Sequence, residues 1–288
     1  MNRFRVVLAA AAILQGRASA QQKQKTYQWI DPDGNIHVSD HPTSQQQAQT
    51  PPPAAARPAA STQAEIPGKS IELPYVALEG TARRVIVNVR FNGRVAAPLA
   101  LDTGSPGMII SASLAKKLDL FSRDQGKLLV LASGIGGDAP AVRTILENVE
   151  IGGAVERFVP VTITNELSDA FAGVVGMDFM GEYAMTIDPK RKVVVLQEQQ
   201  RGAEAPGGHA EHWWRANFAE FRAARDKWRN LRDSLELAAS RSTTVDGMSQ
   251  EELNELRALA KAQARESETL LARLESYAST LQVPRHWR

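Results

Sequence analysis

The spacing of apolar residues changes once along the chain, close to residue 200. Between residues 68 and 198, apolar and polar residues alternate in short segments, as at Val85, Val87 and Val89, with turn residues between the segments. Such alternation is typical of half-buried strands, and many short strands separated by turns predict an all-β barrel or sandwich. Between residues 209 and 283 apolar residues recur every three or four positions, which is the helical period. The chain is therefore expected to be mainly β, with helices at its end.

The β-patterned domain is expected to span residues 68–199, and its strongest local signal is the dipeptide Asn92-Gly93. This pair is typical of a tight hairpin turn, and strands are predicted on either side of it, at residues 85–91 and 95–101. A brief helix is expected at residues 111–118. Further strands are expected near residues 108–110, 128–131, 142–145, 149–151, 155–164, 184–187 and 193–196.

The helical segment, residues 209–283, predicts two helices joined by a turn. The first carries an apolar stripe and the second opens with the capping box Ser249 and Glu252 and stops at Pro284. The second helix has nearly heptad spacing, which Gln263 and Ser267 interrupt. The pattern predicts a helical hairpin or coiled coil. It leaves open whether the hairpin pairs between chains or packs on itself and on the β domain. The stripe of the first helix contains Trp214, Phe218, Phe221, Trp228, Leu231 and Leu235.

The first twenty residues have the organisation of a secretory signal peptide. Arg3 and Arg5 precede the apolar run at residues 6–14, and small residues suited to cleavage end the segment at residues 18–20. A membrane anchor is the alternative, but nine apolar residues are far short of the roughly 20 that span a bilayer. Without this segment the chain carries 31 basic and 32 acidic residues. We therefore expect a periplasmic or secreted protein with no membrane span after cleavage, and nothing in its charge favours nucleic acid as a partner.

Residues 21–42 predict a small β-hairpin module, because apolar residues alternate on both sides of the turn at residues 31–34. The aspartates of that turn also suggest calcium, but the terminal glutamate of a calcium loop is missing, which favours an ordinary turn. The module resembles a short N-terminal module of unknown function found in exported bacterial proteins. Residues 43–67, rich in Pro, Gln and Ala, are expected to form an extended linker.

Composition excludes several kinds of active site. The chain has no cysteine, which excludes disulfides, thiolate metal sites and cysteine nucleophiles. None of the five histidines lies between residues 42 and 208, so the β domain lacks the histidine of a Ser-His-Asp relay and of most zinc hydrolases. His209 and His212 are either a metal-binding pair or, as the lack of an acidic partner motif favours, a surface pair beside the aromatic stripe. We expect neither a metal nor a cofactor.

A candidate catalytic motif, Asp102-Thr103-Gly104, follows directly after the apolar residues Ala100 and Leu101. The triplet alone is a weak signal, because a turn aspartate next to a glycine is common. Two further elements follow the triplet along the chain. The first is a glycine-rich tip formed by Gly134, Ile135, Gly136 and Gly137, and the second is Val174-Val175-Gly176 followed by Met177-Asp178-Phe179-Met180. Over roughly residues 82–198 the chain resembles the retropepsin-like aspartic peptidases, in particular their bacterial single-domain members.

The resemblance implies an acid-protease barrel and a role for each motif. Asp102 would be the catalytic carboxylate, Thr103 would bond across to the partner loop, and Gly104 would let the loop backbone approach the carboxylate and its water. The glycine-rich tip at residues 134–137 would be the substrate-binding flap. Val175 and Gly176 would support the catalytic loop from below.

The chemistry of this family needs two carboxylates that share one proton and activate one water. The sequence has a single D-[ST]-G triplet, so the second Asp102 is expected to come from another copy of the chain in a two-fold homodimer. The predicted function is an aspartic endopeptidase acting on a peptide or protein substrate. The alternative is a non-catalytic envelope scaffold with the same fold that binds a protein partner.

Overall fold

The computed structural model describes residues 27–30, 36–39, 70–77, 84–122, 126–134, 137–165, 167–198, 205–240 and 248–288. The predicted signal peptide, the calcium-like turn at residues 31–34 and the predicted linker lie outside the described residues. So do Ile135 and Gly136 of the predicted flap tip.

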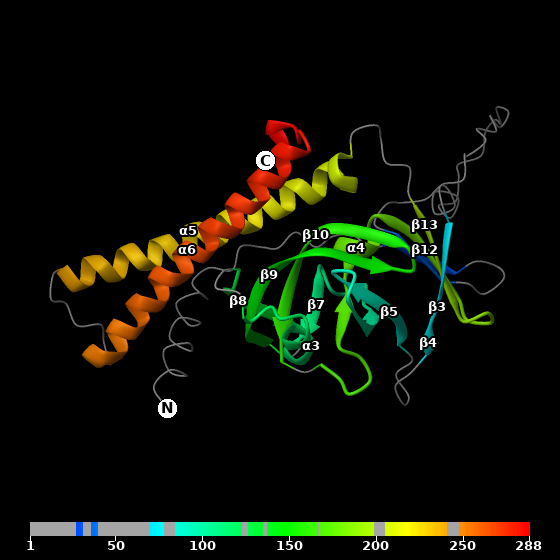
Figure 1. The fold of residues 1–288 in the computed structure, drawn as a ribbon, viewed down its shortest axis with the longest axis horizontal. Helices are drawn as coiled ribbons and strands as arrows, with labels where there is room; N and C mark the ends of the chain where they lie inside the picture. Colours follow the sequence, from blue (N-terminus) through cyan, green and yellow to red (C-terminus); the bar gives the residue numbers. More distant parts are fainter. Residues whose placement is uncertain are drawn as a thin grey trace, which may run out of the picture.

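The larger of two sheets has the strand order β4-β5-β6-β11-β7-β10-β9-β8 (Figure 1). An additional pairing of β5 with β9 links the two halves of the sheet and closes it into a barrel. The bounds of its strands are β4 Val76–Ala77, β5 Val85–Phe91, β6 Val95–Leu101, β7 Met108–Ser111, β8 Leu128–Gly134, β9 Gly137–Ile151, β10 Ala154–Thr164 and β11 Gly173–Val175.

The predicted hairpin at Asn92-Gly93 forms between β5 and β6, and both turn residues have positive φ, 49° and 67°. Asparagine and glycine tolerate this left-handed backbone, which explains why the pair stands at the turn. The prediction of two separate strands at 142–145 and 149–151 was wrong. One continuous strand, β9, replaces them, because it pairs with β10 at residues 142–146 and 148–151 and the register omits only Glu147 between them.

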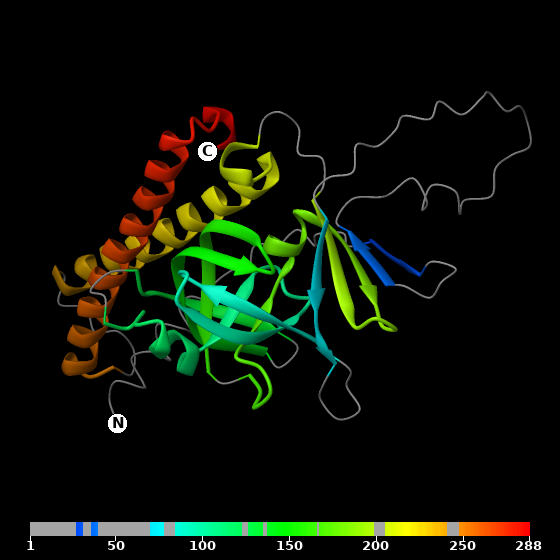
Figure 2. The ribbon, with the colours of Figure 1, turned by 45° about the vertical axis from the view of Figure 1, so that its right-hand side comes forward.

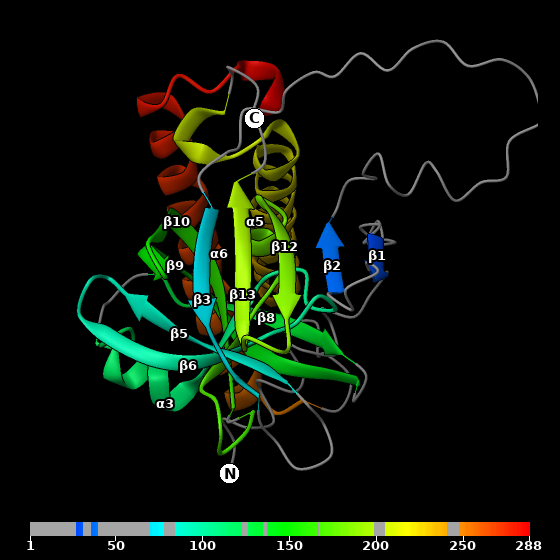
Figure 3. The same ribbon diagram turned by 90° about the vertical axis from the view of Figure 1, so that its right-hand side faces the viewer.

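The smaller sheet has the order β1-β2-β12-β13-β3, and Figure 3 shows its strands side by side. Strand β2 of the N-terminal hairpin pairs antiparallel with β12, so the hairpin extends a sheet that belongs to the β domain. Sequence analysis had not predicted β3, which pairs along the other side of β13. The bounds are β1 Tyr27–Ile30, β2 Ile36–Ser39, β3 Ser70–Pro74, β12 Tyr183–Asp188 and β13 Val193–Glu198.

Two long helices, α5 Glu211–Ser240 and α6 Gln250–Thr280, form the predicted hairpin. The capping box at the start of α6 is present, with Ser249 and Glu252 bonded reciprocally. The helix ends four residues before Pro284, and Gln282 turns the chain away with a φ of 56°. The shorter helical elements are α3 Ala112–Lys117, α4 Met177–Met180, η1 Pro206–Gly208 and η2 Arg285–Trp287.

The helical hairpin packs against one flank of the barrel (Figure 2). Its apolar stripe is buried in a core that also contains the barrel residues Leu128, Ile145 and Phe158. A second core fills the barrel itself and includes Phe91, Leu99 and Met108. Within the chain the hairpin packs on itself and on the β domain, and pairing between chains stays a prediction. Among the described residues, no helix is both long and apolar enough to cross a bilayer.

Candidate active site

Asp102 lies immediately after β6, and its side chain is exposed. Its backbone N–H donates to the carbonyl of Val175 at 3.0 Å, and its carbonyl accepts from the N–H of Ser105 at 3.1 Å. The N–H of Gly104 donates to Asp102 Oδ1 at 2.9 Å. Bonds at both ends of the residue therefore fix the loop, and one of its own amides orients the carboxylate.

Strand β11 and helix α4 support this loop. β11 runs parallel to β6, with Val175 opposite Leu101, and the N–H of Met177 donates to the carbonyl of Ser105 at 2.8 Å. A Cβ on Gly176 would lie 2.4 Å from the carbonyl oxygen of Gly107, closer than atoms can pack. A glycine is thus required where the two segments meet. The structure brings the predicted catalytic triplet together with the predicted supporting residues.

Asp178 is a half-buried residue of α4 whose carboxyl group bonds to the backbone that follows the loop. It accepts hydrogen bonds from the N–H groups of Met108 at 3.0 Å and Phe179 at 2.9 Å. Burial raises the pKa of Asp178 to about 6, although these two bonds and the nearby Arg143 lower it. Sequence analysis named Asp178 only as a member of the element at residues 174–180 and gave it no role of its own. Its position inside the α4 element was the signal that could have identified it as part of the loop's support.

Arg143 connects this region to the helical hairpin. Its guanidinium donates to Thr162 Oγ1 on β10 and to the carboxylate of Glu220 on α5, both at 3.0 Å. A Cβ added to Gly107 would lie 3.8 Å from Nη1 of the same guanidinium and 3.4 Å from Asp178 Oδ2. Both side chains therefore lie beside Gly107. A chain of charged groups therefore runs from α5 to the support of the Asp102 loop.

The predicted flap is a two-stranded arm formed by β8 and β9. The pairing of these strands continues to Gly134 opposite Gly137, the two described residues of the predicted tip. Four strands separate β8 from β6 along the sheet order, and two strands, β9 and β5, separate them across the pairing that closes the barrel. The arm and the catalytic loop are therefore not neighbours within the sheet, although their motifs follow each other in the sequence.

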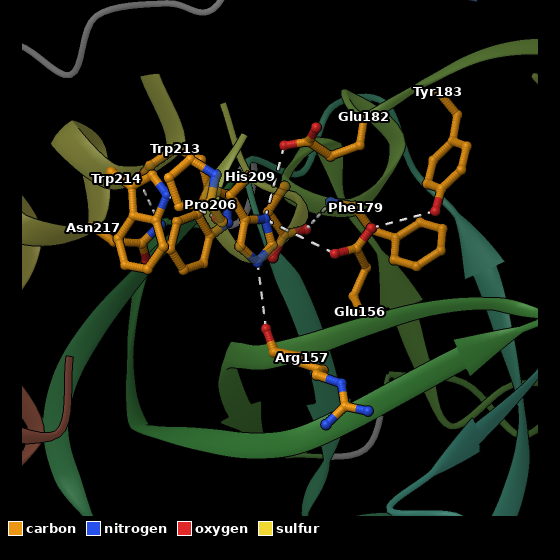
Figure 4. A network of polar contacts seen from close by, with 11 residues as sticks. Glu156, Arg157, Phe179, Glu182, Tyr183, Pro206, His209, Trp213, Trp214 and Asn217 are labelled. Atoms are coloured by element: carbon orange, nitrogen blue, oxygen red, sulfur yellow. Dashed lines mark hydrogen bonds and ion pairs between the residues drawn. The ribbon is translucent and has the colours of Figure 1, made fainter. Parts of the chain in front are cut away.

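A buried polar cluster at the junction of barrel and hairpin was not predicted (Figure 4). His209, just before α5, is 2% exposed, and its Nδ1 lies 3.8 Å from both Glu156 Oε2 and Glu182 Oε1. Its ring stacks on Trp213 with 3.8 Å between centroids, and Nε2 lies 3.3 Å from the carbonyl of Arg157.

The surface-pair interpretation of His209 and His212 was therefore wrong for His209. The first turn of α5 packs onto the barrel and covers this side chain. One sequence signal pointed to the cluster: Glu156 alternates with Ala154 and Phe158, so it occupies an inward position of β10.

Comparison with known proteins adds to this geometry. Residues 87–179 match the family model described as "Aspartyl protease", and this segment runs from β5 to α4 and includes Asp102 and its support. The barrel is retropepsin-like. The match covers less than half of the chain, and the helical hairpin lies outside it.

Two further comparisons bear on the retropepsin-like barrel and its N-terminal neighbour. Residues 8–66 match the model of a domain of unknown function, DUF4124, which confirms the resemblance noted for the N-terminal module. Among solved structures, a retropepsin-like aspartic protease from Rickettsia conorii shares 17% identity, with 45% of this chain and 90% of that chain covered and a TM-score of 0.32. No curated protein matches the chain.

Proposed function

We propose that this chain is an aspartic endopeptidase whose catalytic centre forms between two copies, with Asp102 contributed by each. The observation that carries the proposal is the Asp102 loop, in which an exposed carboxylate is fixed by the Gly104 amide and by backbone bonds to Val175 and Ser105. The aspartyl protease match over the same segment supports it.

The proposed mechanism uses two carboxylates and one water. Two such groups that face each other closely do not both ionise readily, so they share one proton. The ionised Asp102 takes a proton from the water, which attacks the scissile carbonyl carbon, while the protonated Asp102 hydrogen-bonds the carbonyl oxygen. Collapse of the tetrahedral intermediate breaks the C–N bond as a proton passes to the leaving nitrogen. The two products are a carboxylic acid and an amine.

The homodimer follows from the number of motifs. Each chain has one D-T-G triplet, and no second D-[ST]-G occurs in the sequence. An exposed Asp102 is accessible to a second copy, as an isologous two-fold contact requires. Sedimentation of the purified protein tests this step, since a strict monomer at assay concentrations would have only half of the proposed centre.

The decisive experiment is the substitution Asp102→Asn, assayed with a peptide library from mildly acidic to neutral pH. We expect peptide cleavage to fall by about 10²–10⁴-fold, because asparagine cannot accept the proton of the water. Asp169→Asn is the matched control, since Asp169 is also an exposed aspartate of the β domain and should retain activity. Cleavage that persists undiminished in Asp102→Asn would refute the assignment. A wild type that cleaves nothing would favour the scaffold that binds a protein partner.

We also propose that the chain is exported to the periplasm or secreted, on the basis of residues 1–20. N-terminal sequencing of the protein from cells tests this, with the mature chain expected to begin near residue 21. A mature protein that still begins at Met1 would contradict it.

A further inference from the structure

Strand β8 is the last strand of its sheet, and an edge strand exposes backbone groups with no neighbouring strand to bind them. Here a side chain of α6 occupies that edge. Gln263 Oε1 accepts a hydrogen bond from the N–H of Leu129 at 2.7 Å, and Gln263 Nε2 donates to the carbonyl of Lys127 at 3.2 Å. Gln263 is only 7% exposed, so both bonds are shielded from water. Its amide binds β8 as the peptide group of another strand would.

Two more hairpin side chains continue this contact along the backbone. Trp228 on α5 donates from Nε1 to the carbonyl of Leu129 at 3.3 Å. The carboxylate of Glu266, one turn after Gln263 on α6, accepts from the N–H groups of Gly126 and Lys127. The hairpin thus binds five backbone groups within residues 126–129, which lead into β8 and include its first two residues.

The hairpin also holds the second strand of the arm. Arg273 on α6 pairs with Glu147 at 3.0 Å, and Glu220 on α5 pairs with Arg143. Both partners lie on β9 in the part that is paired with β10, since that pairing ends at Val142. These contacts fix the base of the arm on both of its strands.

Beyond this base, from Ala141 to Gly137, β8 is the one strand among the described residues that pairs with β9. A two-stranded ribbon is marginally stable in isolation, so its orientation depends on how its base is held. Leu129 and Gly134 are five residues apart, about 17 Å along a strand. A tilt of about 10° at the base would therefore move the tip by about 3 Å.

We propose that Gln263 and Trp228 are positioning residues through which the helical hairpin sets the orientation of the arm over a bound substrate. This proposal rests on the proposed function and on the flap role that the family resemblance implies for the arm. The hairpin is then a part of the enzyme that controls access to the site. Gln263, one of the two interruptions of the heptad pattern, and Trp228 of the apolar stripe are the side chains that would carry this role.

Two variants test the proposal. Gln263→Leu keeps a similar volume but binds neither backbone group, and Trp228→Phe keeps an aromatic ring but has no N–H for Leu129. The matched control is Ser267→Ala on α6. Ser267 is also buried and polar, but its hydroxyl donates to Ala264 of its own helix. Hydrogen exchange of residues 126–134 and 137–141, and the kinetics of peptide cleavage, are measured in the full-length protein.

With Gln263→Leu we expect amide exchange in the arm to become about tenfold faster, because two backbone bonds at its base are lost. Where the arm of the variant is misoriented in about nine molecules of ten, kcat/KM per folded molecule falls by about tenfold, mainly through a higher KM. Trp228→Phe should show the same changes to a smaller extent. Ser267→Ala should leave KM and exchange in the arm unchanged.

Two results would overturn the proposal. One is unchanged exchange in the arm of folded Gln263→Leu and Trp228→Phe. The other is an equal increase of exchange throughout the barrel and both helices in all three variants, which would indicate only a loss of global stability. The exchange measurement needs no substrate, so it decides the role of Gln263 even if Asp102 is shown not to catalyse peptide cleavage.

Discussion

The Asp102 loop and the junction between barrel and hairpin are both built from polar groups, but they are built differently. The loop is held by backbone hydrogen bonds and by close approach at glycine, and its carboxylate stays exposed. The junction is held by buried polar side chains: Gln263 of α6 bonds to the backbone of β8, and His209 lies between two glutamates. The loop geometry thus depends on backbone bonds and on the absence of a side chain at Gly176, whereas the junction depends on particular buried side chains and the partners they contact.

The largest effect is expected where the loop meets its support. In Gly176→Ala the added Cβ would lie 2.4 Å from the Gly107 oxygen and 2.5 Å from the Gly107 carbonyl carbon, both backbone atoms. We expect a loss of about 4 kcal/mol or more in the free energy of unfolding, because two backbone segments must separate. Denaturant unfolding measures it.

Gly104→Ala is the matched control for this substitution. Its added Cβ would meet only Asp102 Oδ1 within 4 Å, at 3.2 Å, and a side chain can shift. We expect this variant to lose less than about 1 kcal/mol while its peptide cleavage falls. If both alanines were tolerated equally, close approach at Gly176 would not be what holds the loop.

The next effect concerns the junction. His209→Ala removes the imidazole that lies between Glu156 and Glu182 and leaves two carboxyl groups that are only 4% and 5% exposed. We expect the free energy of unfolding to fall by about 3–4 kcal/mol, as when one partner of a buried polar pair is deleted. Stacking on Trp213 is lost as well.

His212→Ala is the control, because His212 is exposed three residues further along the same segment. It should change the free energy of unfolding by less than about 0.5 kcal/mol. Equal losses in the two variants would mean that the buried cluster contributes nothing specific to the docking of α5.

The same contrast explains which parts could be predicted from the sequence. The strands, the hairpin at Asn92-Gly93 and the support at Val175 and Gly176 have local signals, namely alternation, turn chemistry and an unbroken motif. Strand β3 was missed because its five residues contain only two apolar positions before Pro74.

The junction had no such local signal. Gln263 was interpreted as an interruption of a heptad pattern, and the backbone groups that it binds lie 134 and 136 residues earlier in the chain. His209 was interpreted as a surface residue, since its glutamates stand on β10 and beside β12. A polar residue on an apolar helix face indicates a buried partner, but the partner's identity depends on the tertiary fold.

Asp178 lies between the Asp102 loop and Arg143, which pairs with Glu220 of the helical hairpin. The smallest of the expected changes in unfolding free energy is the pH dependence that Asp178 contributes. Its pKa is about 6 in the folded protein against 3.8 for an ordinary aspartate. Between these values the folded state binds more protons than the unfolded state, so the free energy of unfolding falls as the pH rises from 4 to 6. The stabilisation is complete below pH 3.8 and lost above 6, and it amounts to at most about 3 kcal/mol.

Asp178→Asn tests this dependence, because asparagine does not ionise. The difference in unfolding free energy between wild type and variant, measured by urea denaturation at a series of pH values, should change between pH 4 and 6 and be constant above. Parallel curves would show that burial of Asp178 does not raise its pKa. In Glu220→Gln the transition should move to lower pH, because the charge of Glu220 on α5 contributes to raising the pKa of Asp178. A shift of this kind would show that a hairpin residue acts on the support of the catalytic loop, whereas an unchanged transition would confine the hairpin's influence to the arm.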